Sequence, residues 1–285
     1  PMPRTRILMS SEALREVLYE PGWAILDCRS DLADSEAGQR AYSEAHIPGA
    51  MFIDLDRDLA SPVLPETGRH PLPDVEALSL KLGELGIGNA DSVVVYDGGN
   101  GALAARAWWT LRWLGHEAVY VLDGGIARWQ SLAFPTQTEV PSPPVRRFVA
   151  YPDPSKVLTT DELAADAQRI PAFNLLDARD EERYRGAHEP IDPIAGHVPG
   201  AVNAPFSRFV NSNGTWLSLA QRKRLLEEVL GDDRDVAWCV MCGSGVTACH
   251  LAISGIEAGY REPRLYVGSW SEWIRDPGRP VATSN

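Results

Sequence analysis

The chain has 285 residues, of which 44% are hydrophobic and 23% are charged. This is the composition of a globular protein, and it excludes a disordered or fibrous chain. Lys and Arg number 27 against 39 Asp and Glu, and the formal charge of −12 argues against a nucleic-acid partner. No apolar run approaches the roughly 20 residues of a membrane span. We therefore expect one or two compact domains.

The first residues and the cysteines bear on the compartment. Pro1–Arg6 leads into polar sequence, so we expect no secretory signal peptide. Four cysteines are too few for a disulfide scaffold, and three of them, Cys239, Cys242 and Cys249, fall within eleven residues. This clustering predicts reduced thiols, a cytoplasmic protein and thiol chemistry.

Five sequence features occur twice, in the same order, at an offset near 150 residues. They are Ile25–Arg29 with Leu175–Arg179, His46–Ala50 with His197–Ala201, Val93–Gly98 with Val236–Gly243, Leu122–Gly125 with Tyr266–Ser269, and Trp129 with Trp273. The repetition predicts two homologous domains, at 1–137 and 158–285. A proline-rich segment at 138–157 fits an extended linker between them.

Within each copy, short apolar runs alternate with helical stretches. In chain order we predict a strand at 93–96, a helix at 102–113 and a strand at 119–122. After a helix that starts near 160, the second copy gives a strand at 236–241, a helix at 246–258 and a strand at 264–267. This alternation predicts an α/β fold with mostly parallel sheets.

The most informative segment is the loop that follows the strand at 236–241. Cys242 ends the strand, Gly243 and Gly245 permit a tight turn with inward-facing N–H groups, and a helix begins near Val246 or Thr247. Ligands of open parallel sheets bind at this carboxyl edge. A free cysteine titrates near roughly 8.5, and unpaired N–H groups at a helix N-terminus lower that pKa to about 7 or below. We therefore predict a nucleophilic thiolate at Cys242.

We interpret the corresponding loop of the first copy and the other two cysteines of the cluster as structural. The first copy carries Asp97 where the second has its cysteine, and because an aspartate cannot carry sulfur, we expect the first copy to be inactive. Cys239 lies three residues before Cys242 on the same strand and so faces the other side of the sheet. Cys249 falls inside the following helix. We expect both in the core, with a regulatory disulfide left as an alternative.

Two other cysteine chemistries lack the residues that they need. A cysteine phosphatase loop places an arginine after five intervening residues, and that position holds Ala248. A structural zinc site needs a second cysteine pair, and His250 lies on a different helix face from Cys249. We expect no bound metal.

Taken together, these residues resemble the two-domain rhodanese family of sulfurtransferases. The loop from Cys242 to Ala248 is similar to the active loop of 3-mercaptopyruvate sulfurtransferases. The supporting motifs are His46–Ala50, Gly196–Gly200, Trp108–Trp109 and Gly268–Trp273. The resemblance covers nearly the whole chain and implies tandem rhodanese-like domains, each with a mostly parallel sheet flanked by helices.

The resemblance also implies a double-displacement reaction. Cys242 takes a sulfane sulfur from a small-molecule donor, becomes a persulfide, and passes the sulfur to a thiol, cyanide or a thioredoxin-like acceptor without a cofactor. Backbone N–H groups of the loop would hold the charge, at Gly243, Gly245, Val246 and Thr247. Ser244 and His46 match the hydroxyl and imidazole of a Ser–His–Asp relay. Its carboxylate is left open, with Asp34 and Glu36 as nearby candidates.

The arginines leave the donor open. Arg183 matches the family arginine that contacts the donor, Arg179 either binds the donor or braces the fold as Arg29 does in copy one, and Arg185 is solvated. Mercaptopyruvate enzymes have a second arginine nine residues after the first, where this chain has Asp192. Thiosulfate enzymes lack that arginine but carry cationic residues in the loop, which are absent here. We give the loop more weight than the missing arginine. We therefore favour 3-mercaptopyruvate as the donor, with thiosulfate as the alternative.

Two further functional classes compete with catalysis. A non-catalytic persulfide carrier or binding module is one, and the intact loop counts against it. A thiol–disulfide oxidoreductase built on Cys239 and Cys242 is the other, and it fails if a Cys239→Ser variant keeps full activity.

Overall fold

The computed structural model describes residues 6–166 and 174–284, so Pro1–Thr5, which carry part of the expectation about a signal peptide, lie outside it. Two sheets of five strands each account for its architecture. The first contains β1 (Leu8–Met9), β2 (Trp23–Asp27), β3 (Met51–Phe52), β4 (Ser92–Tyr96) and β5 (Val119–Leu122). The second contains β6 (Val157–Leu158), β7 (Asn174–Asp177), β8 (Val202–Asn203), β9 (Trp238–Met241) and β10 (Arg264–Tyr266).

The two sheets have the same topology. Their strand orders are β1-β5-β4-β2-β3 and β6-β10-β9-β7-β8, and every strand pair is parallel. The register is equivalent too, because Leu26 lies opposite Val95 in the first sheet and Leu176 lies opposite Val240 in the second. The predicted α/β class with tandem, mostly parallel sheets is confirmed.

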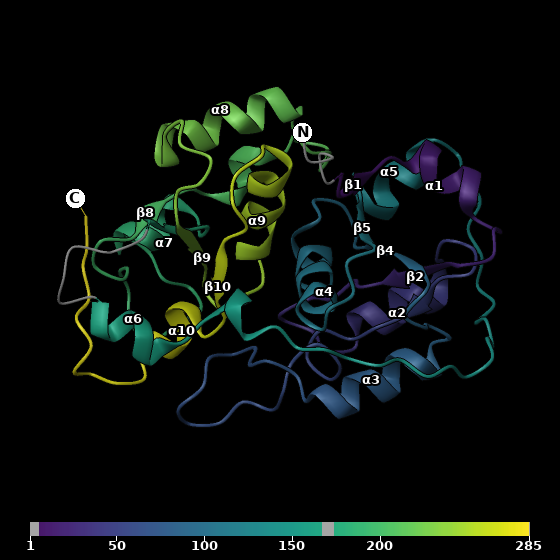
Figure 1. Cartoon of the computed structure of the whole chain (residues 1–285), viewed down its shortest axis with the longest axis horizontal. Coiled ribbons are helices and arrows are strands. Elements are labelled where there is room, and N and C mark those ends of the chain that lie inside the picture. Colours follow the sequence, from purple (N-terminus) through teal and green to yellow (C-terminus); the bar gives the residue numbers. More distant parts are fainter. Residues whose placement is uncertain (1–5, 167–173, 285) are drawn as a thin grey trace.

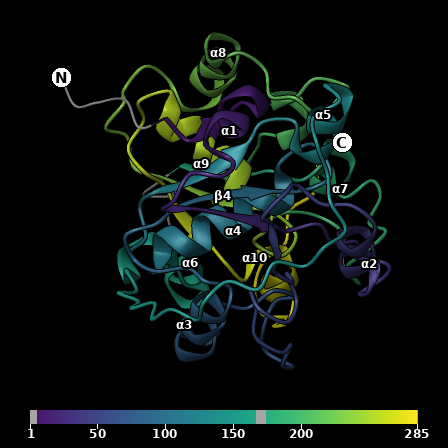
Figure 2. The ribbon, with the colours of Figure 1, turned by 90° about the vertical axis from the view of Figure 1, so that its right-hand side faces the viewer.

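Helices cover both faces of each sheet. Those of the first half are α1 (Ser11–Val17), α2 (Ala37–Glu44), α3 (Val75–Glu84), α4 (Ala102–Trp113) and α5 (Gly125–Ser131). Those of the second half are α6 (Thr160–Asp166), α7 (Glu181–Arg185), α8 (Leu219–Leu230), α9 (Ala248–Glu257) and α10 (Ser269–Trp273), with short 3₁₀ turns η1 (Pro154–Lys156) and η2 (Phe206–Phe209). In Figure 2, α1 and α5 lie on one side of β4, and α3 and α4 lie on the other.

Alternate residues of the central strands pack into different cores. In β9, Val240 packs in the large cluster shared with α8 and α9, whereas Cys239 and Met241 pack against α6 and α10. In β4, Val95 packs in the same large cluster, whereas Val94 packs in a separate cluster with residues of α1 and α5. A parallel sheet buried on both faces needs such continuous apolar strands, which is why the runs read as unbroken in the sequence.

The large cluster joins the two halves of the molecule. Helix α4 packs against α9 in the middle of the structure, as Figure 1 shows. In each half this helix directly follows the loop at the carboxyl end of the central strand, so the loops that begin at Asp97 and Cys242 both open at the domain interface. The predicted helix at 102–113 and strand at 119–122 are confirmed; the second helix begins at Ala248, slightly later than expected, because Val246 and Thr247 still belong to the loop.

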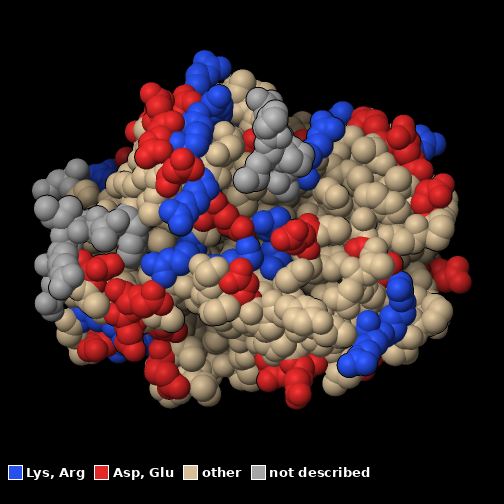
Figure 3. Space-filling model, in the orientation of Figure 1, with Lys and Arg blue, Asp and Glu red and all other residues tan. Residues whose placement is uncertain are grey.

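The surface agrees with the composition. Acidic and basic side chains alternate over the face seen in Figure 3, without a large field of either sign. None of the helices within residues 6–166 and 174–284 combines the length and apolar character needed to cross a bilayer.

Candidate active site

The loop of Cys242 is fixed from below by the segment that follows β10. The backbone N–H of Cys242 donates to Ser269 Oγ at 3.1 Å, and its carbonyl accepts from Trp270 N at 3.0 Å. Ser271 N donates to the carbonyl of Gly243 at 2.9 Å. Ser269 itself has a φ of 54°, an uncommon value for a residue with a side chain. This turn holds the base of the loop rigidly, so the sulfur has a defined position.

One backbone donor of the loop contacts the sulfur, and others in the loop have no acceptor among the described residues. Gly245 N donates to Cys242 Sγ at 3.1 Å. Within the part of the chain that the structure describes, no protein acceptor takes the N–H groups of four loop residues, which are Gly243, Ser244, Val246 and Thr247. Helix α9 follows at Ala248 and adds the positive end of its dipole. The arrangement favours negative charge on Cys242 or on a sulfur atom attached to it.

Gly245 is required by this geometry. Its φ is +80°, and a Cβ atom there would lie 2.4 Å from the carbonyl oxygen of Val267. A side chain would therefore clash with fixed backbone and rotate the N–H that points at Cys242 Sγ.

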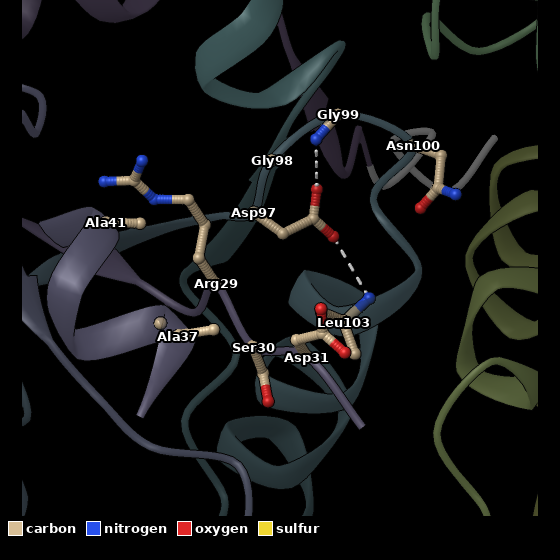
Figure 4. Close-up of a pocket in the computed structure, with 11 residues that line it drawn as sticks. Arg29, Ser30, Asp31, Ala37, Ala41, Asp97, Gly98, Gly99, Asn100 and Leu103 are labelled. Atoms are coloured by element: carbon tan, nitrogen blue, oxygen red, sulfur yellow. Dashed lines mark hydrogen bonds between the residues drawn. The ribbon is translucent and has the colours of Figure 1, made fainter. Parts of the chain in front are cut away.

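The equivalent loop of the first half has its donors occupied. Asp97 Oδ1 accepts from Gly99 N and Gly101 N at 3.0 and 3.1 Å, and Oδ2 accepts from Leu103 N and Ala104 N, both at 3.0 Å. Figure 4 shows this carboxylate turned back into its own loop, beside a pocket that Arg29 also lines. The Asp97 side chain thus takes four backbone N–H groups of its own loop and helix start, and the first loop has no thiol in the place of Cys242.

The other thiols have no comparable surroundings. Cys239 lies on the opposite face of β9, and burial raises its pKa to about 11. Cys249 lies inside α9, where its Sγ contacts the Gly245 carbonyl at 3.6 Å and burial raises its pKa as well. Cys239 and Cys242 cannot meet as a redox pair in this arrangement because the sheet separates them.

Two arginines from different halves of the chain converge beside the loop. Arg183, on α7, places Nη2 3.1 Å from the point where a Cβ on Gly243 would stand. Arg69, in the loop between β3 and α3, places its Nη2 3.0 Å from the same point. Asp192 lies between them and forms an ion pair with each. Arg183 is where the sequence placed it, whereas Arg69 was missed.

Arg179 braces the fold. Its Nε and Nη2 bind Asp177, Nη2 also donates to the Gly196 carbonyl at 2.8 Å, and its side chain is 1% exposed. Arg29 makes the same contacts with Asp27 and the Ala45 carbonyl in the first half. These contacts fit a structural role for Arg179 better than a role in binding the donor.

A buried arginine connects the halves at the loop. Arg106, on α4, is inaccessible to solvent and donates Nη1 to the Gly245 carbonyl at 3.0 Å. Its Nη2 donates to the carbonyls of Leu59 and His70 at 3.1 and 2.9 Å. Burial lowers the pKa of Arg106, and attraction to the sulfur atoms of Cys249 and Cys242 opposes that shift.

The structure does not bring His46 to the cysteine loop. Its Nδ1 lies 2.7 Å from the Tyr42 carbonyl and its Nε2 lies 2.8 Å from the Glu139 carbonyl, and the ring stacks on Tyr42. Both ring nitrogens are therefore used within the first half of the chain. Asp34, one candidate for the relay carboxylate, instead pairs with the exposed Arg40.

His70 and Asp56 form a pair that the sequence analysis missed. His70 Nε2 lies 3.0 Å from Asp56 Oδ1, and the buried Nδ1 has no protein partner among the described residues. Burial and then the charge of Arg106 lower the pKa of His70, so its ring is neutral near pH 7. The guanidinium that binds the His70 carbonyl also binds the Gly245 carbonyl, which places this pair at the edge of the cysteine loop.

Comparison with known proteins agrees with this geometry. A family model described as a rhodanese-like domain matches the chain twice, at residues 10–132 and 159–276. The chain belongs to the rhodanese family. A probable 3-mercaptopyruvate sulfurtransferase of Pseudomonas aeruginosa is 47% identical over 283 residues, which cover 98% of both chains. A putative thiosulfate sulfurtransferase, SseB, of Mycobacterium tuberculosis is 38% identical over 260 residues, 90% of each chain.

Solved rhodanese structures superpose closely. SseA of Escherichia coli, a 3-mercaptopyruvate sulfurtransferase, matches with a TM-score of 0.82 at 30% identity, covering 94% of this chain and all of that one. The 3-mercaptopyruvate sulfurtransferase of Leishmania major matches with a TM-score of 0.85 at 26% identity, covering 97% of this chain and 77% of that one. These similarities extend over both rhodanese domains.

The geometry of the Cys242 loop predicts the effect of adding a methyl group at Gly245. In this rhodanese, Gly245→Ala should lower kcat/KM at least ~100-fold, because loss of one aligned donor to a developing anion has a cost of that order. The measurement is a steady-state sulfur-transfer assay, with the folded fraction checked by thermal unfolding. Gly98→Ala in the first loop is the control, because a Cβ there meets nothing within 4 Å. Wild-type activity in Gly245→Ala would contradict the assignment of Gly245 N as a sulfur ligand.

Proposed function

We propose that the protein transfers a sulfane sulfur from 3-mercaptopyruvate to a thiol or cyanide through a persulfide on Cys242. The main support is that Cys242 Sγ accepts a hydrogen bond from Gly245 N and that two guanidinium groups lie directly beside its loop. The loop suits a thiolate and a persulfide, and a guanidinium suits the carboxylate of a small donor. Thiosulfate as donor is the alternative.

In the first half-reaction, the Cys242 thiolate attacks the sulfur of 3-mercaptopyruvate. The new S–S bond forms as the C–S bond breaks, and its electron pair leaves on the carbon as the enolate of pyruvate. One proton must reach that carbon, and the donor thiol supplies one. The N–H groups of Gly243, Ser244 and Gly245 stabilise the charge on the sulfur atoms.

A relay would carry that proton. We assign its imidazole to His70 rather than His46, and its carboxylate to Asp56, with the Ser244 hydroxyl as the group nearest the donor. The support is the short contact between His70 and Asp56 and the attachment of His70 to the loop through Arg106. A neutral imidazole can accept and return a proton without a net change in charge.

In the second half-reaction, an acceptor thiolate attacks the outer sulfur of the persulfide. An S–S bond forms with the acceptor, the bond to Cys242 breaks, and its thiolate is restored. Cyanide reacts in the same way and leaves as thiocyanate. A thioredoxin-like protein acceptor and a cytoplasmic compartment belong to the proposal, and four unpaired cysteines support a reducing environment.

One observation favours thiosulfate as the donor. Asp192 occupies the place of the second donor-binding arginine of mercaptopyruvate enzymes. A thiosulfate sulfurtransferase is also among the similar proteins. The absence of cationic side chains within the loop itself, from Gly243 to Thr247, argues the other way.

Steady-state assays with each donor test the proposal. With cyanide as acceptor and Cys242→Ser as blank, kcat/KM for 3-mercaptopyruvate should exceed that for thiosulfate by at least ~10-fold, the factor that corresponds to about 1.4 kcal/mol. Preference for thiosulfate would establish the alternative donor. Equal activity in wild type and Cys242→Ser would contradict the persulfide mechanism.

The assignment of His70 makes a separate prediction. His70→Asn should lower kcat with 3-mercaptopyruvate by about 100-fold or more, the usual size of a general acid–base contribution. With thiosulfate the leaving sulfite needs no proton, so kcat should change little, which gives an internal control for folding. His46→Asn is the matched variant. If His46→Asn shows the donor-selective loss and His70→Asn does not, the relay belongs to His46.

A further inference from the structure

The donor side of the site contains a carboxylate between two arginines. Asp192 is 8% exposed, and its two oxygens bind different partners, Oδ1 to Arg69 and Oδ2 to Arg183, the latter at 3.2 Å. Glu189 holds Arg183 from behind, with Oε1 3.2 Å from Nε. Arg179 also reaches Glu189, with Nη1 3.6 Å from Oε1, and it pairs with Asp177. Positive and negative side chains thus alternate here.

The two guanidinium groups approach one point from two domains. Both Nη2 atoms lie within 3.1 Å of the position that a Cβ on Gly243 would occupy. Gly243 follows the nucleophile directly, so a donor whose sulfur meets Cys242 Sγ would bring its acidic group to these nitrogens. The backbone of Arg69 is held beside the loop. Its backbone N–H donates to Ser271 Oγ at 3.1 Å, and Ser271 N donates to the Gly243 carbonyl.

We propose that Arg69 is the second donor-binding guanidinium and that Asp192, held between Arg69 and Arg183, selects singly charged donors over doubly charged ones. This inference rests on the proposed function and names the residues that decide its specificity. The inactive domain would then supply part of the donor site, at the place where a second arginine is missing from the catalytic domain.

The selection follows from charge. 3-Mercaptopyruvate with its thiol protonated carries one negative charge, and thiosulfate carries two. Two guanidinium groups attract either donor and Asp192 repels it, and both effects are doubled for the dianion. The guanidinium groups alone would therefore favour thiosulfate, and the charge of Asp192 reduces that preference. In a site shielded from solvent this difference is weakly screened, so a single buried carboxylate can decide between the two donors.

Two variants separate this role from a merely structural one. Asp192→Asn keeps the shape of the side chain and an oxygen that accepts from an arginine, but removes the charge. Arg69→Gln removes one guanidinium and changes no residue of the second domain. Arg57→Gln and Glu162→Gln are matched controls, because Arg57 and Glu162 form exposed ion pairs, with Glu36 and Arg264.

We expect Arg69→Gln to raise KM for both donors by about 10-fold or more while kcat at saturation changes little, since each tenfold reflects about 1.4 kcal/mol of lost binding. We expect Asp192→Asn to shift the ratio of kcat/KM values toward thiosulfate by a similar factor. Both control variants should behave as wild type. An unchanged KM in Arg69→Gln, or an unchanged donor ratio in folded Asp192→Asn, would overturn the proposal.

A binding measurement keeps this test independent of turnover. Calorimetric titration of the resting enzyme with pyruvate and with sulfate compares a monoanion with an unreactive dianion. Arg69→Gln should weaken pyruvate binding by about 10-fold, and Asp192→Asn should strengthen sulfate relative to pyruvate. If the wild type turns over neither donor, the proposed function fails while these titrations still decide the site. Pyruvate binding that is absent in wild type, or equal in wild type and Arg69→Gln, would overturn the proposal.

Discussion

A buried arginine of the first rhodanese domain holds the cysteine loop of the second. Among the residues that the structure describes, the hydrogen-bond partners of Arg106 are backbone carbonyls, in the cysteine loop and in the segment that carries Arg69 and His70. Removing a charge from water costs several kcal/mol unless its donors are satisfied, so these carbonyls must stay where they are. The position of the nucleophile and the position of the groups around it thus depend on one guanidinium.

Because of this constraint, the first domain contributes to the cysteine loop of the second. Its own loop is closed by the Asp97 carboxylate, which takes four backbone N–H groups that would otherwise hold an anion. The domain contributes elsewhere, through α4 packed on α9 and through the loop before α3. In this account, one rhodanese domain carries the sulfur and the other supplies the arginine and histidine that face it.

The sequence predicted the duplication, the parallel sheets and the cysteine loop, because each leaves a local pattern: repeated motifs, continuous apolar strands, and glycines beside a cysteine. It missed Arg69, His70 and Arg106, because their roles arise from contacts between residues far apart in the chain. His46 attracted the relay assignment through its place in a repeated motif, but His197 occupies the same place in copy two and likewise binds a local carbonyl and stacks on Tyr184. That repetition was the available signal of a structural role for His46, and it is one reason why we propose His70, which has no counterpart in copy two, for the relay.

The central claim is that sulfur resides on Cys242 between the two half-reactions. Its most direct test is mass spectrometry of the protein after incubation with 3-mercaptopyruvate in the absence of an acceptor, with peptide mapping of the labelled site. The account predicts one additional sulfur atom, on the peptide that contains Cys242, removed by cyanide and absent from Cys242→Ser. Sulfur on Cys239 or Cys249 instead, or a disulfide without added sulfur, would contradict it.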